Sequence, residues 1–493
     1  MARNIFRGFV SVFSADIGVL LLSAAITPLL VRVLTSAEYG DYAFVLAVLS
    51  IIMIVVNAGI FDGTRKYIAE VHEGNWQTHV FAFYFRIAGI LALTASASLI
   101  GVISSGLVEA QLGKQFNIYF YMLTALIIVR QFWAFGRGTL MGLGHEHLSE
   151  PMKLLRWILF ALVGLPLAAY GYDVIGLLFG RIVARGLVGI AAFYFVTKHI
   201  PYAAIAESIP TTFPRRELLS YNSLSIVLIL LTNSLYKTDL LLLKPLAGSA
   251  TTGYYNAALV AAQFVWLAPT ALQTVFLQST SEMWSQNRNT AITNLISRAT
   301  RYVVLFTALL CIGLFALADV FVPLYFGSEF EPAITPLRLL LPGVFGFAIA
   351  RPIFAVGQGK GDLRVLVYAT GASALLNLVL NLLLIPRYGT NGAAIATSIG
   401  YASMVVFHVL GARQIGFDPI ADLRLGQVIA TVAVSIPSIL FLASVTKPSL
   451  ISLVVVPPVG FVVHSLAAIA FGAIDLAELR EIRQQVPIDI LSR

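Results

Sequence analysis

Long apolar runs separated by short polar segments recur along the whole of this 493-residue chain. A helix needs roughly 20 mainly apolar residues to cross the hydrocarbon core of a bilayer. The pattern therefore predicts 14 transmembrane helices, at about residues 9–31, 42–61, 80–106, 116–136, 154–172, 174–197, 219–243, 254–277, 300–324, 333–350, 364–385, 392–412, 425–445 and 450–472. The first run is too long for the core of a signal peptide, so we expect a retained span.

Glycine and tyrosine positions between these runs recur about 213 residues apart. Gly40 and Tyr42 lie between two apolar runs, and Gly253 and Tyr255 lie in the same setting in the second half. Further matches at nearly the same spacing are Gly144 with Gly357, Gly171 with Gly389 and Gly176 with Gly392. Six spans precede the second copy, so both copies keep the same orientation. A duplicated apolar chain is typical of a transporter with a cavity between its halves.

The predicted fold class is all-α. We expect a polytopic membrane protein with two parallel six-helix repeats around a central cavity and two further C-terminal helices. The expected parts are an N-terminal bundle at 1–198, a cytoplasmic connector at 199–218, a C-terminal bundle at 219–413, two additional spans at 414–474 and a cytoplasmic tail at 475–493. The connector contains three prolines, Pro201, Pro210 and Pro214. Because proline disrupts regular helices, we expect the connector not to form one continuous helix.

Composition and charge support this membrane class. The chain is 58% hydrophobic and 11% charged, which excludes an ordinary soluble globular protein. With the N-terminus inside, 21 Lys and Arg residues fall in inside segments, and only five fall outside, namely Arg32, Lys114, Lys244, Arg387 and Lys447. The net charge of +8 therefore indicates cytoplasmic loops and no nucleic-acid partner. We expect a multi-pass protein of the cytoplasmic membrane with both termini inside.

The sequence contains none of the motifs that mark common catalytic or metal centres. No HExxH, P-loop or GxSxG pattern occurs, and the predicted external loops are short. His145 and His147 flank Glu146, but residues two apart do not share a helix face and no third ligand is apparent. The single cysteine, Cys311, lies in a predicted span and excludes a disulfide framework. We therefore expect transport without catalysis, cofactor or metal.

Two arginines lie deep in the sixth predicted span. Arg181 and Arg185 are four residues apart and therefore share a helix face, with about 6 Å of rise between them. Guanidinium groups in this arrangement can bind successive phosphates through paired hydrogen bonds. The alternative is a salt bridge within the membrane or snorkelling toward the headgroups. Their predicted span, 174–197, contains no acidic residue that could neutralise them. This favours a cavity-facing anion site.

Several other ionisable residues lie in or near predicted spans. Lys237 and Asp239 diverge around the seventh span, so Lys237 is a further substrate-binding candidate, and Asp239 either pairs with a cation or carries a coupling ion. Asp16 either forms a salt bridge or holds a proton or sodium ion. Arg338 near the outer start of the tenth span is a substrate-binding candidate at an external vestibule, or it snorkels. Near the cytoplasmic ends of their predicted spans lie Arg86, Arg130 and Arg351, and snorkelling is the better explanation for most of them.

Two stretches carry a resemblance to a known family. Pro28-Leu29-Leu30-Val31-Arg32-Val33-Leu34 is followed by Glu38-Tyr39-Gly40-Asp41-Tyr42, and Asp239-Leu240-Leu241-Leu242-Leu243 by Gly253-Tyr254-Tyr255-Asn256-Ala257-Ala258. With 14 spans and short loops, this pattern resembles the polysaccharide-biosynthesis exporters of the multidrug/oligosaccharidyl-lipid/polysaccharide flippase superfamily. The resemblance covers essentially the whole chain, and its motifs are loose.

The resemblance implies that the protein flips a lipid-linked oligosaccharide to the outer leaflet by alternating access. The carrier would be a polyprenyl or dolichyl phosphate or diphosphate, and the last two spans would help to hold its tail. Glycan-assembly membrane proteins would be partners, and the membrane potential or an ion at a carboxylate such as Asp16 would bias the cycle. Two alternatives are an ion-coupled multidrug exporter of the same superfamily and a membrane glycan polymerase or ligase.

Overall fold

The computed structural model describes residues 2–70, 72, 74–220, 223–446, 450–478 and 480. This described part is helical and contains no β-strand. Within it, 12 helical segments are long and apolar enough to cross a membrane. Two of the segments, Glu146–Val196 and Leu363–Ile415, are more than 50 residues long, and each folds back on itself as two spans. The predicted all-α class with about 14 spans is confirmed.

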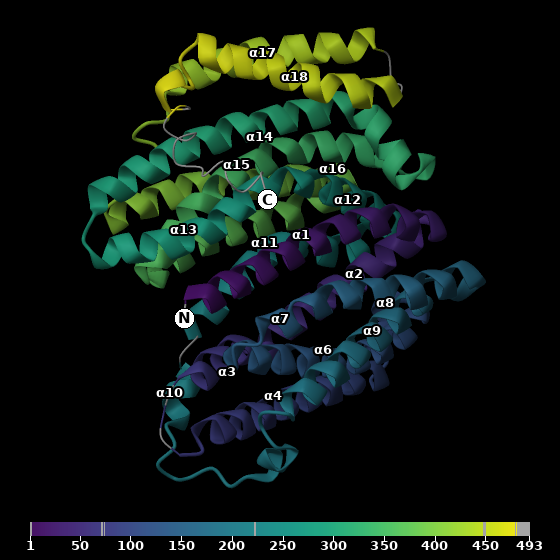
Figure 1. The fold of residues 1–493 in the computed structure, drawn as a ribbon. Helices are drawn as coiled ribbons and strands as arrows, with labels where there is room; N and C mark the ends of the chain where they lie inside the picture. Colours follow the sequence, from purple (N-terminus) through teal and green to yellow (C-terminus); the bar gives the residue numbers. More distant parts are fainter. Residues whose placement is uncertain are drawn as a thin grey trace. The chain divides into compact units, whose positions relative to one another are not determined.

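The chain divides into two compact units, Met1–Gly253 and Tyr254–Arg493, each described here by itself. Figure 1 shows the helices of unit 1 in purple to teal. They are α1 Ala2–Val33, α2 Ser36–Asn57, α3 Ile60–Ala69, α4 Trp76–Ser104, α5 Leu107–Leu112, α6 Gln115–Gly142, α7 Glu146–Ser149, α8 Pro151–Leu167, η1 Ala168–Tyr172, α9 Asp173–Val196, η2 Tyr202–Ala206, α10 Arg215–Ser220 and α11 Ser223–Ala247. The seventh predicted span, α11, thus belongs by its contacts to unit 1.

Helix α12, Ser249–Gln263, crosses the boundary into unit 2. The helices of unit 2 are drawn in green to yellow in Figure 1. They are η3 Phe264–Trp266, α13 Leu267–Ser285, α14 Asn289–Phe326, η4 Ser328–Ala333, α15 Ile334–Lys360, α16 Leu363–Ile415, α17 Leu425–Val445 and α18 Leu450–Ala470. The two last helices, α17 and α18, pack on each other and on α14.

The first glycine pair of the repeat brings two backbones into contact within unit 1. Helix α2 begins with a capping box, in which Thr35 and Glu38 each bond the other's backbone N–H. One turn into this helix, a Cβ on Gly40 would lie 1.9 Å from the Ser249 carbonyl oxygen. A Cβ on Gly253 would lie 2.0 Å from the carbonyl oxygen of Ser36. Only glycine permits so close an approach at either position.

The second set of repeated glycines builds the two hairpins. Gly171 joins α8 to α9 with φ 91°, and Gly389 bends α16 with φ 54°. Both angles are in the left-handed region that glycine adopts without strain. Just beyond each bend, a Cβ on Gly176 would lie 2.7 Å from the backbone N of Ala168, and one on Gly392 would lie 2.3 Å from the backbone of the opposite arm. The hairpins are therefore equivalent elements of the two copies.

The match of Gly144 with Gly357 does not hold in the structure. Gly144 forms a turn with φ 77°, whereas Gly357 lies inside helix α15, where a Cβ would meet the side chain of Leu366. The equivalent turn in unit 2 is at Gly361, with φ 83°. The second copy is about one helical turn longer at this point, and counting along the chain at a fixed spacing therefore selects the wrong glycine.

The connector after α9 packs against unit 1 rather than running free. Phe213 and Leu218 belong to the same buried cluster as Trp133. The hydroxyl of Tyr84 donates to the carbonyl of Leu218 at 3.1 Å. Arg86 donates to connector carbonyls between η2 and the proline-rich stretch. The connector is thus anchored to the helices that precede it.

Candidate functional site

Arg181 and Arg185 lie well inside α9, away from both of its ends. Arg181 is eight residues after Asp173, the first residue of the helix, and Arg185 is 11 residues before Val196, the last. At 1.5 Å of rise per residue, Arg185 is about 17 Å from that end. Its side chain is 8% exposed, and its Nε has no hydrogen-bond partner among the described residues. Arg185 is therefore held inside the span and does not snorkel.

Aromatic side chains from two other helices hold the guanidinium of Arg181. Its Nε donates to the hydroxyl of Tyr42 on α2. Its Cζ lies 4.7 Å from the ring centre of Phe160 and 5.8 Å from that of Trp157, both on α8. It also lies 5.3 Å from the Tyr42 ring. Cation–π contacts orient a guanidinium without neutralising it, so Arg181 keeps its charge available.

Arg130 on α6 lies beside Arg185, although the sequence pattern placed it near a span end. The parallel helices α6 and α9 pack so that a Cβ on Gly189 would lie 2.9 Å from the ring of Phe132. Arg185 precedes Gly189 by one turn, and Arg130 precedes Phe132 by two residues. The charges of the two arginines interact. The apolar run ends at residue 136, but α6 continues to Gly142, so Arg130 is in mid-helix and not at an edge.

Arg156 on α8 joins the same group. In the α8–α9 hairpin, a Cβ on Gly180 would lie 2.5 Å from the Cα of Gly164. From this contact, Arg156 and Arg185 lie toward the same end of the hairpin, and Arg156 interacts with the charges of the other arginines. The sequence pattern counted it as an inside charge. Pro151, which opens α8, was the available signal that the helix begins earlier, because proline is favoured at the first helical position.

We call these groups the cation cluster, which comprises Arg130, Arg156, Arg181, Arg185 and Lys237. Among the residues that the structure describes, no Asp or Glu side chain forms an ion pair with any member. Arg185 lies close enough to interact with the charges of Arg130, Arg156 and Arg181. It also interacts with the phenol group of Tyr42. Lys237 on α11 interacts electrostatically with Asp239 and with Arg130. The cluster therefore contains four arginines without a carboxylate.

This arrangement is suited to binding an anion. Like charges repel strongly where the local dielectric is low, so an anion that enters the cluster relieves repulsion as well as forming hydrogen bonds. Guanidinium groups match phosphate oxygens in pairs. The members come from α6, α8, α9 and α11, so they approach a common region from several helices. The arrangement is chemically suited to a negatively charged group that has more than one oxygen.

Asp16 lies in an ion-pair chain at the predicted cytoplasmic end of unit 1. Lys153 Nζ lies 2.5 Å from an oxygen of Asp16 and 2.6 Å from one of Glu150. Glu150 in turn pairs with Arg137 at 2.8 Å. The structure thus shows the salt bridge that was one of the two alternatives for Asp16. Asp239 is fully buried on α11, and an ion-coupling role for either carboxylate stays a prediction.

Arg338 lies in unit 2 on α15, where it is paired with an acid. Its Nη2 lies 2.7 Å from Asp319 on α14, and its Cζ lies 5.1 Å from the ring centre of Phe315. It borders an apolar groove of about 450 Å³ that is lined by α14, α15 and residues such as Ile436 on α17. Unlike the arginines of the cluster, Arg338 has a carboxylate partner.

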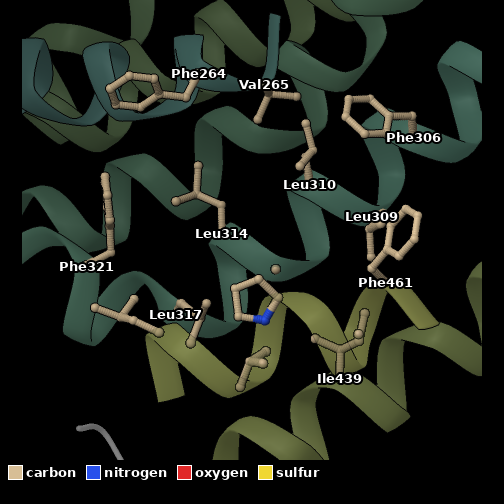
Figure 2. A pocket seen from close by; sticks show the side chains of 15 residues that line it. Phe264, Val265, Phe306, Leu309, Leu310, Leu314, Leu317, Phe321, Ile439 and Phe461 are labelled. Carbon is tan, nitrogen blue, oxygen red and sulfur yellow. The ribbon is translucent and has the colours of Figure 1, made fainter. Parts of the chain in front are cut away.

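A second groove of about 410 Å³ lies between α14 and the pair α17–α18 (Figure 2). Leucine and phenylalanine side chains of α14 line one side, and Ile439 and Phe461 line the other. A hydrogen bond of 2.8 Å between Ser435 and His464 joins α17 to α18. Apart from Arg338, the residues that line the two grooves are mainly apolar, and such linings suit hydrocarbon chains.

The fold is that of a polytopic α-helical membrane protein with a cation cluster inside unit 1. Among solved structures, the chain is similar to the lipid II flippase MurJ in an inward closed conformation, with a TM-score of 0.73 and 15% identity over 96% of this chain and 99% of that one. It is also similar to an inward-facing multidrug transporter of the MATE family, with a TM-score of 0.67 and 16% identity over 80% of this chain and 94% of that one. At these identities the likeness shows the fold.

The sequence comparison then gives the family. Residues 29–335 match the model of the polysaccharide biosynthesis protein family, and the chain belongs to that family. A relative from Haloferax volcanii, named as the probable low-salt glycan biosynthesis flippase Agl15, is 24% identical over 385 residues, which cover 76% of this chain and 77% of the relative. The predicted membership of the flippase superfamily is confirmed.

Proposed function

We propose that this protein flips a lipid-linked oligosaccharide from the cytoplasmic to the outer leaflet of the cytoplasmic membrane. The observation that carries the proposal is the cation cluster, in which four arginines have no carboxylate partner. A phosphate-bearing sugar head cannot cross hydrocarbon unaided, because removing its charges from water is too costly. The cluster replaces that water. The family and the name of the Haloferax relative support this function.

The tail of the carrier remains in an apolar environment while the head crosses. A polyprenyl or dolichyl chain fits the two grooves beside α14, α17 and α18. Arg338 at the border of one groove is a further candidate for binding a phosphate. Rocking of the two halves exposes the head to one side at a time. Both termini lie in the cytoplasm, and membrane-bound glycan-assembly proteins are the expected partners.

The carboxylates Asp239 and Asp16 are the candidates for coupling transport to an ion. Asp239 on α11 is fully buried, whereas Asp16 is exposed and pairs with Lys153. Protonation of Asp239, or a sodium ion bound to it, would change the charge at the edge of the cluster. The membrane potential acts on the same charges, since moving one elementary charge across 100 mV is worth about 2.3 kcal/mol.

An ion-coupled multidrug exporter is the alternative that the fold allows, since a MATE transporter shares it. Substrates of that kind are commonly cations, and the cation cluster would repel them. A glycan polymerase or ligase would need a sizeable external loop for its catalytic groups. In the described ranges, every predicted external connection is about a dozen residues or shorter. The charge of the cluster and the short loops therefore favour the flippase.

Reconstitution in proteoliposomes tests the proposal directly. A fluorescent lipid-linked oligosaccharide is added to both leaflets, and a reductant that cannot cross the bilayer reports the fraction that has been flipped. We expect the double variant Arg181→Ala, Arg185→Ala to lose at least tenfold in initial rate. Arg387→Ala, an exposed arginine outside the cluster, is the matched control and should flip at the wild-type rate. A double variant that flips normally would rule out this anion site.

A further inference from the structure

The cation cluster has more positive charge than a lipid diphosphate can balance. Its five members include one, Lys237, that has a carboxylate nearby, Asp239. Four arginines remain without any acidic partner in the described part of unit 1. A sugar joined through a single phosphate carries one negative charge, and a sugar joined through a diphosphate carries two. Either head leaves at least two arginines without a counter-charge.

Unpaired positive charge within a membrane span is energetically costly unless a bound substrate carries negative charges that balance it. Ionised groups within a span are normally paired or face a polar ligand. Arg185 is the clearest case, because its side chain is 8% exposed and its Nε lacks a partner among the described residues. Arg181 gains only aromatic faces and a tyrosine hydroxyl, which orient its charge without cancelling it. The surplus is thus a property of the binding site and not of an exposed surface.

The surplus charge belongs to the same arginines that would bind the phosphates. Arg130, Arg156 and Arg185 lie at similar depth on three different helices, and Arg181 lies one turn from Arg185. A compact diphosphate can face only part of such a ring at one time. The remaining guanidinium groups then face the first sugars, which are attached directly to the diphosphate. A carboxylate or another phosphate on those sugars would form the same paired hydrogen bonds with arginine.

We propose that the natural head group carries at least one fixed negative charge on the sugars nearest its diphosphate, and that the cation cluster selects for this charge. The inference rests on the proposed flippase function and deepens it. The shared chemistry is an oxyanion next to the diphosphate, either the carboxylate of a uronic acid or a further phosphate. A neutral sugar diphosphate would occupy the site with part of the arginine cluster unbalanced.

The test compares three short-chain fluorescent lipids in the same proteoliposomes. Their heads are glucosyl diphosphate, glucuronosyl diphosphate and glucose-6-phosphate joined through its anomeric carbon to the lipid diphosphate. We expect both acidic heads to be flipped at least tenfold faster than the neutral head. The two acidic arms distinguish a carboxylate from a phosphate. A neutral head that is flipped as fast as both acidic heads would overturn the inference and leave the proposed function standing, whereas no flipping of any head would overturn both.

A variant of the cluster makes the test independent of absolute rates. Arg156→Gln removes one positive charge and keeps a hydrogen-bonding side chain of similar length. We expect it to slow both acidic heads more than the neutral head, so that the preference for acidic over neutral heads falls by about tenfold. Arg387→Gln, outside the cluster, should keep the wild-type preference. An Arg156→Gln preference equal to that of the wild type would contradict selection by charge.

Discussion

The two units share an architecture but treat their buried arginines in opposite ways. In unit 1, Arg185 is buried with no acidic partner among the described residues. In unit 2, Arg301 on α14 is fully buried, yet it pairs with Glu478 at 2.6 Å and with Asp422 at 3.0 Å. The buried arginine of unit 2 thus has two carboxylate partners, whereas that of unit 1 has none among the described residues. The hairpins and their glycines recur in both units, but the surroundings of the buried arginines differ.

The arginine of unit 2 should show the largest effect on stability. Arg301→Ala removes the centre of the network and leaves two carboxylates that it had joined. Breaking a buried ion pair typically costs about 3–5 kcal/mol, and we expect a loss near the lower end because Asp422 is partly exposed. Thermal unfolding in detergent measures the change.

The exposed pair Arg413–Asp418, at 3.4 Å, provides the control. Pairs at the surface are worth about 0–1 kcal/mol, so Arg413→Ala should unfold close to the wild type. If Arg301→Ala were as stable as Arg413→Ala, the ion pairs of Arg301 would not stabilise unit 2, and the proposed contrast between the two units would be wrong.

The arginine of unit 1 should show the opposite sign. Arg185→Gln removes an unbalanced charge from mid-span, where an arginine costs about 2.5–3.5 kcal/mol to place. We expect the variant to be more stable by about 2 kcal/mol in detergent, and to lose flipping activity. A gain of stability with a loss of function identifies a residue kept for its substrate. A variant that melts earlier than the wild type would show that Arg185 is a structural residue.

Sequence pattern was sufficient for the spans and the hairpins. Apolar run length predicts a span directly, and Gly171 and Gly389 mark bends because few other residues adopt their backbone angles. The ends of the helices were less predictable, since α6 continues through polar residues that an apolar run excludes. Arg130 was therefore read as a residue at a span edge. The end of an apolar run indicates where contact with lipid ends. A helix can continue past that point, as α6 does to Gly142.

The surroundings of Arg181 were not predictable from sequence at all. Arg181 and Arg185 stand out because charges are rare in spans, and the sequence alone sufficed to select them. Tyr42 and Phe160, however, reach Arg181 only through the packing of α2 and α8 against α9. No spacing along the chain encodes a contact across 139 residues. The sequence thus selected two charged residues as candidates, and the structure shows which side chains orient Arg181.

The glycines of the hairpins should behave alike in both units, unlike the arginines. Gly176→Ala and Gly392→Ala each place a Cβ within 2.7 Å of backbone atoms in the opposite arm. Overpacking of this kind costs about 1–3 kcal/mol, and we expect similar losses in thermal stability for the two variants. Gly89→Ala, in α4 with open space beside it, is the control and should gain up to about 1 kcal/mol from helix propensity. Unequal losses would show that the hairpins are not equivalent.

The network of unit 2 also predicts a small dependence of stability on pH. Burial raises the pKa of Glu478, but hydrogen bonds from Tyr302 and Arg301 and the charges of Arg301 and Arg424 outweigh it, so the pKa is lowered from its usual 4.5. A carboxyl group with a lowered pKa in the folded state adds stability above pH 4.5, and this stability is lost as the pH falls through the folded value. Melting curves between pH 7 and pH 3.5 should therefore show an acid-dependent decrease that is smaller in Glu478→Gln. Because Glu478→Gln keeps the shape of the side chain and cannot ionise, an unchanged acid limb in this variant would remove Glu478 from the network that distinguishes unit 2 from the unbalanced arginines of unit 1.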